Sequence, residues 1–296
     1  MKRQKRFVTA LAWSAVLTAL VMVAKAQGPT PAPLVVHPLK GNVSWVEGGG
    51  GNSGVIVGNP GVIVVDAKIT PASGKALLDD IAKVTPKPVN TVILTHSDRD
   101  HVNGVAAFPA GITIIAQENN KKEQERAIAA GGKDAPQADR LPTRVITKQK
   151  DRLKVDGVPL ELLHWGPAHT SGDLVVYLPQ QKIVFTGDII TNRPDPLIHL
   201  EKDGSSEGWI ETAKGIAALD ADTFLPGHGA PETKAQVQEY VAHAEAKRTK
   251  IKDLVAQGKS LDEIKSAVGD APPARSGNGP AFATFTEVVY RELTKK

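Results

Sequence analysis

The sequence lacks cysteine altogether, so none of its 296 residues can form a disulfide bond or supply a thiolate ligand. Any metal site in this chain must therefore be built from histidine, aspartate and glutamate. The sequence also lacks an internal repeat with a period of about 20–50 residues, which disfavours a solenoid. Its composition, 41% hydrophobic and 23% charged, excludes disordered, collagen-like and coiled-coil chains and indicates a globular domain of enzyme size.

The first 26 residues contain no acidic side chain and carry five basic ones. Four of these precede a mostly apolar run over residues 7–23, and Ala24-Lys25-Ala26 has the small-x-small pattern of a cleavage site. These features predict a signal peptide over residues 1–26, cleaved after Ala26, and hence a periplasmic or secreted protein. A retained membrane anchor is the alternative. A lipoprotein is excluded because no cysteine follows the apolar run.

Removal of residues 1–26 changes the charge balance. The whole chain has a formal net charge of +4, and loss of the five basic residues lowers it to −1. The basic character thus belongs to the leader and does not indicate nucleic-acid binding. The expected partner of the mature chain is a small-molecule substrate, with neither nucleic acid nor membrane.

Apolar patterning predicts two halves, each with strands followed by helices. Short β-branched runs between residues 34 and 65 predict an antiparallel meander with a turn at Asn59-Pro60-Gly61. Two such halves predict two packed sheets with helices outside. The later elements expected from periodicity are a helix at 73–84, strands at 89–94 and 112–115, an exposed helix at 118–130, a strand-rich block at 153–185, a strand at 223–225, and helices at 206–219, 233–257, 261–268 and 282–293.

The segment Thr95-His96-Ser97-Asp98-Arg99-Asp100-His101 directly follows the apolar run 92–94. A loop that leaves a buried strand can turn alternate side chains toward one point, and imidazole and carboxylate both bind divalent metals. Taken alone, the segment is also compatible with a solvated polar loop. Its potential metal ligands are His96, Asp98, Asp100 and His101.

Further polar residues stand at the ends of apolar runs. Asp66 follows residues 62–65, and Asp188 ends the run 183–187. His169 lies in Gly-Pro-Ala-His-Thr, and His228 lies in Pro-Gly-His-Gly after residues 223–225. Strand ends are where open α/β sheets place ligands, and neighbouring glycines let the backbone approach closely. One such residue is usually a turn or capping residue, but this many in one chain favour a metal centre.

In order and spacing, these motifs resemble those of the metallo-β-lactamase superfamily: a strand-end Asp, His-x-His-x-Asp-His, a His before Thr, an Asp after Gly, and Gly-His-Gly. The resemblance implies an α/β fold, a four-layer αββα sandwich of two mixed β-sheets, over residues 34–232. Residues 233–296 would be a helical extension packed on the same domain. The resemblance also implies two zinc ions per chain, the first held by His96, Asp98 and His169, and the second by Asp100, His101 and His228, with Asp188 bridging.

Asp98 is the departure from the family pattern, which has histidine at this position. The aspartate makes the metal site one unit of charge more negative. Its harder oxygen ligand loosens the preference for zinc and favours iron or manganese, and it makes a bound hydroxide easier to protonate. The alternative is a tolerated substitution in an ordinary dizinc enzyme.

The function that the resemblance implies is an exported, metal-dependent hydrolase. A metal-bound hydroxide, formed because the ions lower the pKa of water toward roughly 7, would attack a lactam, lactone, ester or thioester bond, as in a β-lactamase. Asp100 would be catalytic, orienting the nucleophile and passing a proton to the leaving group, and Asp66 would support the site from behind a ligand.

Three other functions are kept as alternatives: a non-haem iron oxidoreductase of the same fold, a phosphodiesterase-type or phosphotriesterase-type hydrolase, and a metal-binding protein without turnover. The substrate and the oligomeric state stay open. Asn192 and His199 have either a substrate-facing role or a surface role.

Residues 49–54 fit the G-x-G-x-x-G pattern of dinucleotide-binding proteins. Because an apolar strand pattern follows and not a helix, the dinucleotide interpretation fails. A glycine-rich hairpin near the active site, common in the resembling family, is expected instead.

Overall fold

A computed structural model describes residues 33–132, 135–270, 273 and 281–295. The predicted signal peptide, residues 1–26, lies outside the described residues. No helix within those residues is both long enough and apolar enough to span a bilayer.

Within the described residues, the first sheet contains seven strands that lie side by side in the order of the sequence. The pairs from β1 to β4 are antiparallel, which confirms the predicted meander, and those from β4 to β7 are parallel. Helical segments connect the parallel strands. The strands are β1 (Val35–Pro38), β2 (Val43–Glu47), β3 (Ser53–Val57), β4 (Val62–Val65), β5 (Val89–Ile93), β6 (Thr113–Gln117) and β7 (Arg144–Ile146).

In the same described part of the chain, the second sheet contains five strands in the spatial order β12-β11-β10-β9-β8. Its strands pair antiparallel except β11 and β12, which are parallel and are connected through helix α4. Both sheets are therefore mixed. The strands are β8 (Lys150–Val155), β9 (Val158–Leu163), β10 (Val175–Leu178), β11 (Ile183–Gly187) and β12 (Thr223–Pro226).

Side-chain caps begin most of the helices. Thr70 caps α1 and Pro71 stands at its first position, while Thr233, Ser260 and Thr284 form capping boxes at α5, α6 and α7. The α-helices are α1 (Pro71–Val84), α2 (Arg99–Val102), α3 (Glu118–Ala130), α4 (Ser206–Ala218), α5 (Lys234–Ala256), α6 (Leu261–Val268) and α7 (Phe285–Thr294).

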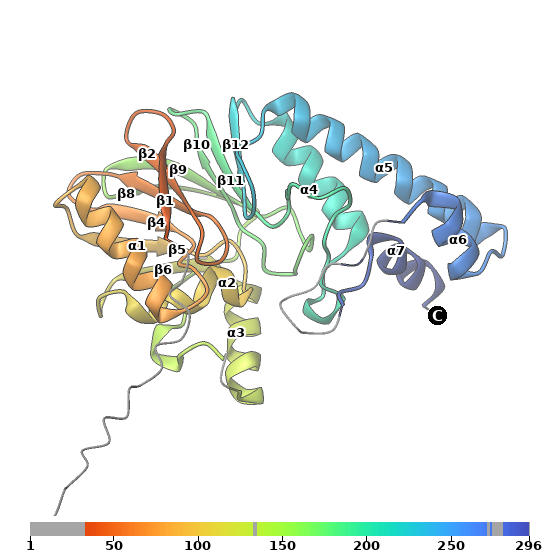
Figure 1. Ribbon diagram of the computed structural model, residues 1–296, viewed down its shortest axis with the longest axis horizontal. Coiled ribbons are helices and arrows are strands. Elements are labelled where there is room, and N and C mark those ends of the chain that lie inside the picture. The colour runs from red at the N-terminus through yellow and green to blue at the C-terminus, as the bar shows by residue number, and fades with distance from the viewer. Residues whose placement is uncertain (1–32, 133–134, 271–272, 274–280, 296) are drawn as a thin grey trace, which may run out of the picture. The chain divides into compact units, whose positions relative to one another are not determined.

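Three clusters of buried apolar side chains separate four layers. The central cluster joins the facing sides of the two sheets, with Ile63 from one and Phe185 from the other. A second lies between the first sheet and α1, and a third lies between the second sheet and helices α4 to α7. Figure 1 shows α1 and α3 beside the strands of the first sheet and α4 to α7 on the other side. The predicted αββα sandwich is confirmed.

The C-terminal helices share a core with the second sheet. Phe285 and Val288 of α7 are completely or almost completely buried and belong to the same cluster as Trp209 of α4 and Val184 of β11. At the start of α4, the backbone N–H of Ser206 donates to Glu292 Oε1 of α7 at 2.8 Å. Apolar and polar contacts thus both tie α7 to α4.

Helix α3 differs from the expected exposed helix. Its bounds are as predicted, but three of its polar side chains, Asn120, Glu123 and Gln124, are buried. Glu123 accepts hydrogen bonds from Ser97 and Ser171, both in loops next to the candidate ligands. Polar residues on this helix therefore support the centre, which periodicity of apolar residues could not reveal.

Candidate metal centre

The candidate ligands meet at the carboxyl ends of strands from both sheets. Strands β4 and β5 run parallel in the first sheet, and β11 and β12 run parallel in the second. The side chains that follow these strands thus lie at one edge of the sandwich, where α/β proteins place their sites. Asp66 follows β4, the segment 96–101 follows β5, Asp188 follows β11 and His228 follows β12, while His169 comes from the loop between β9 and β10.

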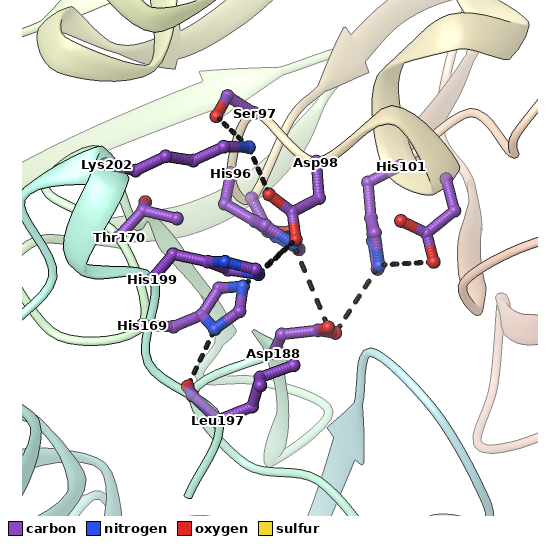
Figure 2. Close-up of polar contacts among 12 residues, drawn as sticks. His96, Ser97, Asp98, His101, His169, Thr170, Asp188, Leu197, His199 and Lys202 are labelled. Atoms are coloured by element: carbon purple, nitrogen blue, oxygen red, sulfur yellow. Dashed lines mark hydrogen bonds and ion pairs between the residues drawn. The ribbon is translucent and has the colours of Figure 1, made fainter. Parts of the chain in front are cut away.

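The first cluster contains His96, Asp98, His169 and Asp188, with one ligand atom of each lying within 4.8 Å of the others. Asp98 Oδ2 lies 3.3 Å from His169 Nε2 and 3.7 Å from His96 Nε2 (Figure 2). His169 Nδ1 lies 2.8 Å from the carbonyl oxygen of Leu197. A proton on Nδ1 satisfies that carbonyl and leaves Nε2 free to act as a ligand.

The second cluster contains Asp100, His101 and His228. Asp100 Oδ2 lies 3.1 Å from His228 Nε2 and 3.9 Å from His101 Nε2. The two imidazole Nε2 atoms are 3.4 Å apart. The His101 side chain is 0% exposed and that of His228 is 39% exposed, so the cluster opens to solvent on the His228 side.

Asp188 lies between the two clusters. Its Oδ1 is 3.4 Å from His101 Nε2, and its Oδ2 is 3.5 Å from His228 Nε2 and 4.0 Å from His96 Nε2. Figure 2 shows its carboxylate reaching toward both His96 and His101. One carboxylate thus faces ligand atoms of both sets, as a bridging ligand must.

Two buried polar atoms in this centre form no hydrogen bond within the described residues: His96 Nε2 and Asp188 Oδ1. A buried polar atom without a partner costs free energy, so each such atom requires an explanation. A divalent cation among these donors would satisfy both. Imidazole and carboxylate ligands without thiolate suit zinc, and also iron or manganese. The residues present therefore fit a metal centre.

Electrostatics in the centre favour positive charge. Burial disfavours the charged form of His101, but the carboxylates of Asp188, Asp66 and Asp100 outweigh it and raise the pKa to about 10. Burial likewise works against ionisation of Asp188 and Asp100, yet neighbouring histidines, His101 foremost, hold the pKa of both carboxyls below the ordinary value. The carboxylates stay ionised and attract cations.

Asp66 supports His101 from behind. Its Oδ2 lies 2.8 Å from His101 Nδ1 and accepts a hydrogen bond from Thr95 Oγ1 at 2.7 Å, while its Oδ1 accepts from the Thr95 backbone N–H at 2.8 Å. A carboxylate at Nδ1 sets the tautomer and the orientation of the ring, which leaves Nε2 facing the cluster.

The glycine-rich segment 48–51 packs directly against the centre. The Gly51 N–H donates to the carbonyl oxygen of Asp100 at 3.0 Å. A Cβ on Gly51 would lie 2.2 Å from Cε1 of His101, so no larger residue fits here without displacing the imidazole. Strand β3 follows this segment, which agrees with its interpretation as a hairpin and not as a dinucleotide motif.

Two residues near Asp98 were not assigned from the sequence. Lys202 lies on a 3₁₀ turn (Leu200–Lys202), and its ammonium contacts Asp98 Oδ1. His199, whose role was open, has Nε2 3.2 Å from Asp98 Oδ2 and Nδ1 2.5 Å from Glu201 Oε1. Burial lowers the pKa of His199, but Asp98 and Glu201 overcome this and raise it to about 10. No local motif marks Lys202, because more than a hundred positions separate it from Asp98.

Beside the two clusters lies a cavity of about 350 Å³. Asp98, Asp100, Asp188 and His228 face it, and Leu197 and Phe282 form apolar parts of its wall. Asn192 lines a neighbouring hollow, where its Nδ2 donates to Glu232 Oε1 at 2.8 Å. The rest of the cavity wall consists of Arg99, Arg193, His199, Glu201 and Lys202.

Comparison with protein families gives a match to the metallo-beta-lactamase superfamily over residues 46–228. This span is more than half of the chain. It begins in β2 and ends at His228, so it contains every candidate ligand.

The chain is similar to two curated relatives that differ in activity. It is 28% identical over 209 residues to the 2,4-dinitroanisole O-demethylase subunit alpha of a Nocardioides species, covering 68% of this chain and 61% of the relative. It is 21% identical over 279 residues to a linear primary-alkylsulfatase of a Pseudomonas species, covering 79% of this chain and 52% of the relative. The chain thus spans less than two thirds of the length of either.

A solved structure shares the fold. The stereoselective inverting sec-alkylsulfatase of a Pseudomonas species superposes with a TM-score of 0.67 at 21% identity, covering 88% of this chain and 50% of the other. A coverage of 88% corresponds to more residues than the segment 1–228 contains. The structural similarity therefore extends into the C-terminal helical region.

Proposed function

The chain belongs to the metallo-β-lactamase superfamily, and from this membership we propose that it is an exported hydrolase that uses two zinc ions to cleave a lactam, lactone, ester or thioester bond. One observation carries the proposal: two clusters of histidine and carboxylate ligands share Asp188 at the wall of a cavity large enough for a small molecule.

The ligand sets follow from the two clusters. His96, Asp98 and His169 would hold one ion, Asp100, His101 and His228 the other, and Asp188 would contact both. When bound, such ions activate water and polarise the bond to be cleaved. Iron or manganese in place of zinc would be favoured by the carboxylate of Asp98.

Residues of the cavity wall can transfer a proton and contact the substrate. Asp100, ionised and 26% exposed at its side chain, can accept a hydrogen bond from the attacking water and pass a proton to the leaving group. Leu197 and Phe282 offer an apolar surface to the substrate, and the guanidinium of Arg193 offers a positive charge. Together they favour a substrate with an apolar body and a polar or anionic group.

A sulfate ester is a second candidate for the cleaved bond. The match to the primary-alkylsulfatase covers 79% of this chain, and the structural similarity to the sec-alkylsulfatase covers 88% and so continues past residue 228 into the C-terminal helical region. Phe282 precedes α7 and lines the cavity, so the C-terminal region contributes to the substrate site here. Arg193 would then face the sulfate group.

The hydrolase proposal is tested by the Asp100→Asn variant. The zinc-loaded chain should hydrolyse at least one member of a panel of a chromogenic lactam, a lactone, an aryl ester, a thioester and an alkyl sulfate. Asp100→Asn should lower that activity by about 100-fold or more, because an amide neither takes up the proton nor replaces the carboxylate as a ligand of the second ion. Asp253→Asn, on the exposed face of α5, is the matched control and should keep full activity. Absence of activity toward the whole panel, or an unimpaired Asp100→Asn variant, would contradict the proposal.

We also propose that the chain is exported, and this proposal rests only on the predicted signal peptide over residues 1–26. Expression in a Gram-negative host, followed by mass measurement of the periplasmic fraction, should give a chain that begins at Gln27. A full-length chain in the membrane fraction would indicate a retained anchor instead.

A further inference from the structure

The two oxygens of Asp98 face different partners. Oδ2 points toward the imidazoles, at 3.3 Å from His169 Nε2, 3.2 Å from His199 Nε2 and 3.7 Å from His96 Nε2. Oδ1 points away from them and contacts the ammonium of Lys202 (Figure 2). Only Oδ2 is therefore directed at the metal-ligand cluster.

Lys202 is held in this position by several contacts. Its backbone N–H donates to the carbonyl oxygen of His199 at 3.0 Å, and its own carbonyl oxygen accepts from the Ser171 N–H at 2.9 Å. The ammonium also donates to Ser97 Oγ at 3.1 Å, and Ser97 Oγ in turn donates to Glu123 of α3. The ammonium is thus fixed at Oδ1 from two directions.

The Asp98–Lys202 pair changes the electrostatic consequence of having aspartate at position 98. A carboxylate adds one negative charge relative to a neutral imidazole, and the adjacent ammonium adds one positive charge. The ammonium of Lys202 contacts Oδ1 directly as an ion pair. The pair is therefore ionic, and its net charge equals that of a neutral histidine.

The pair also limits how Asp98 can bind a cation. A free carboxylate can coordinate through one or both oxygens, and a second oxygen ligand suits manganese, which takes more oxygen ligands than zinc does. An ammonium on Oδ1 leaves Oδ2, which also faces His199 Nε2 at 3.2 Å, as the one oxygen directed at a cation. With His96 and His169, the chain then offers three ligand atoms besides the shared Asp188, as a three-histidine site would.

We propose that Lys202 is the positioning residue of the first metal site, restricting Asp98 to one coordinating oxygen and cancelling its charge so that the site keeps a preference for zinc over manganese. This inference rests on the proposed metal-dependent function. It assigns to Lys202, which lies outside the sequence motifs, the selection of the metal.

The test compares the affinities of the metal-free full chain for Zn²⁺ and Mn²⁺, each measured by competition with a chelating dye. In Lys202→Met, Oδ1 of Asp98 loses its partner, and the ratio of manganese to zinc affinity should rise by about tenfold, a size typical of changes in groups that support metal ligands. Lys202→Arg keeps a cationic donor and should keep the wild-type ratio. Lys148→Met, on an exposed segment, is the matched control.

A second background isolates the role of Asp98. Asp98→His removes both carboxylate oxygens, so Lys202 no longer has a carboxylate to restrict. Adding Lys202→Met to this variant should therefore leave the manganese-to-zinc ratio unchanged. The proposal would be overturned if the single variant Lys202→Met left the manganese-to-zinc ratio unchanged. It would also be overturned if Lys202→Met changed this ratio equally in the wild-type and Asp98→His backgrounds. A raised KM with an unchanged ratio would instead identify Lys202 as a substrate contact.

Failure of this inference and failure of the proposed function are distinguishable. If the wild-type chain binds neither ion, the metal-dependent function itself is wrong. If it binds zinc but the ratio does not depend on Lys202, only the role of Lys202 is wrong.

Discussion

At the scale of single residues, the chemistry of the centre depends on Asp98. Its carboxylate stands where the superfamily pattern has an imidazole, and the other ligands follow the pattern. Oxygen at this position favours harder metals, whereas the ammonium of Lys202 at Oδ1 opposes that effect. We therefore propose that the metal preference of this chain depends on two residues, Asp98 inside the motif and Lys202 far from it.

The side chains that meet in the candidate centre could be found in the sequence because each stands in a short motif at the end of an apolar run. For example, His96, Asp188 and His228 each come shortly after a strand formed by the apolar residues that precede them in the sequence. Lys202 and Glu201 could not be predicted, because their contacts with Asp98 and His199 arise only when the loop after β11 folds back over the centre.

Lys68 is another residue that the sequence leaves undetected. A lysine is expected at the surface, yet this one is 0% exposed, and its ammonium donates to the carbonyl oxygens of Val46 at 2.6 Å and Gly51 at 2.9 Å. It thereby fixes the glycine-rich segment that packs on His101. Burial lowers its pKa from 10.5 to about 7, against the opposing effect of Asp66 and Glu47.

The lowered pKa of Lys68 predicts a pH dependence of stability. Between pH 7 and pH 10.5 the unfolded chain binds a proton at Lys68 that the folded chain releases, so the free energy of unfolding rises with pH in this window. From pH 7 to pH 9 the wild type should gain about 2 kcal/mol relative to Lys68→Met. Urea unfolding of both proteins at the two pH values measures the difference. Parallel pH profiles would show that the buried lysine is not the cause, and Lys148→Met should follow the wild type.

At the scale of elements, apolar periodicity predicted the long or strongly one-sided segments. Helix α6 (Leu261–Val268) has the predicted bounds, and α4 differs by one residue at its end. The periodicity missed β7, which has three residues of which two are exposed, and α2, which is a single turn. Segments this short carry no period, and their structure depends on the neighbours with which they pair.

Helix α7 is predicted to be part of one cooperative unit with the second sheet. Phe285 is 1% exposed in a cluster that contains residues of α4, α5 and β11. Phe285→Ala should lower the free energy of unfolding by about 3–5 kcal/mol, with a single transition seen by both circular dichroism and tryptophan fluorescence. Two separate transitions, with only the earlier one shifted, would mean that the C-terminal helices unfold independently.

At the scale of the whole molecule, the candidate ligands come from both sheets. The segment 96–101 follows a strand of the first sheet, whereas Asp188 and His228 follow strands of the second. A metal bound by both sets would link the two halves of the sandwich, so binding should also stabilise the fold. Asp188, which faces both clusters, is the candidate ligand common to both sets.

The measurement that tests the central claim most directly is the metal content of the chain, made with zinc, iron and manganese all supplied. The account predicts about two ions per chain in the wild type. In His101→Ala it predicts about one ion, loss of hydrolysis and an unchanged circular dichroism spectrum, because only the second cluster loses a ligand. His243→Ala, an exposed histidine outside the centre, should retain both ions. A wild-type chain without metal, or a His101→Ala variant that keeps both ions and full activity, would contradict the account.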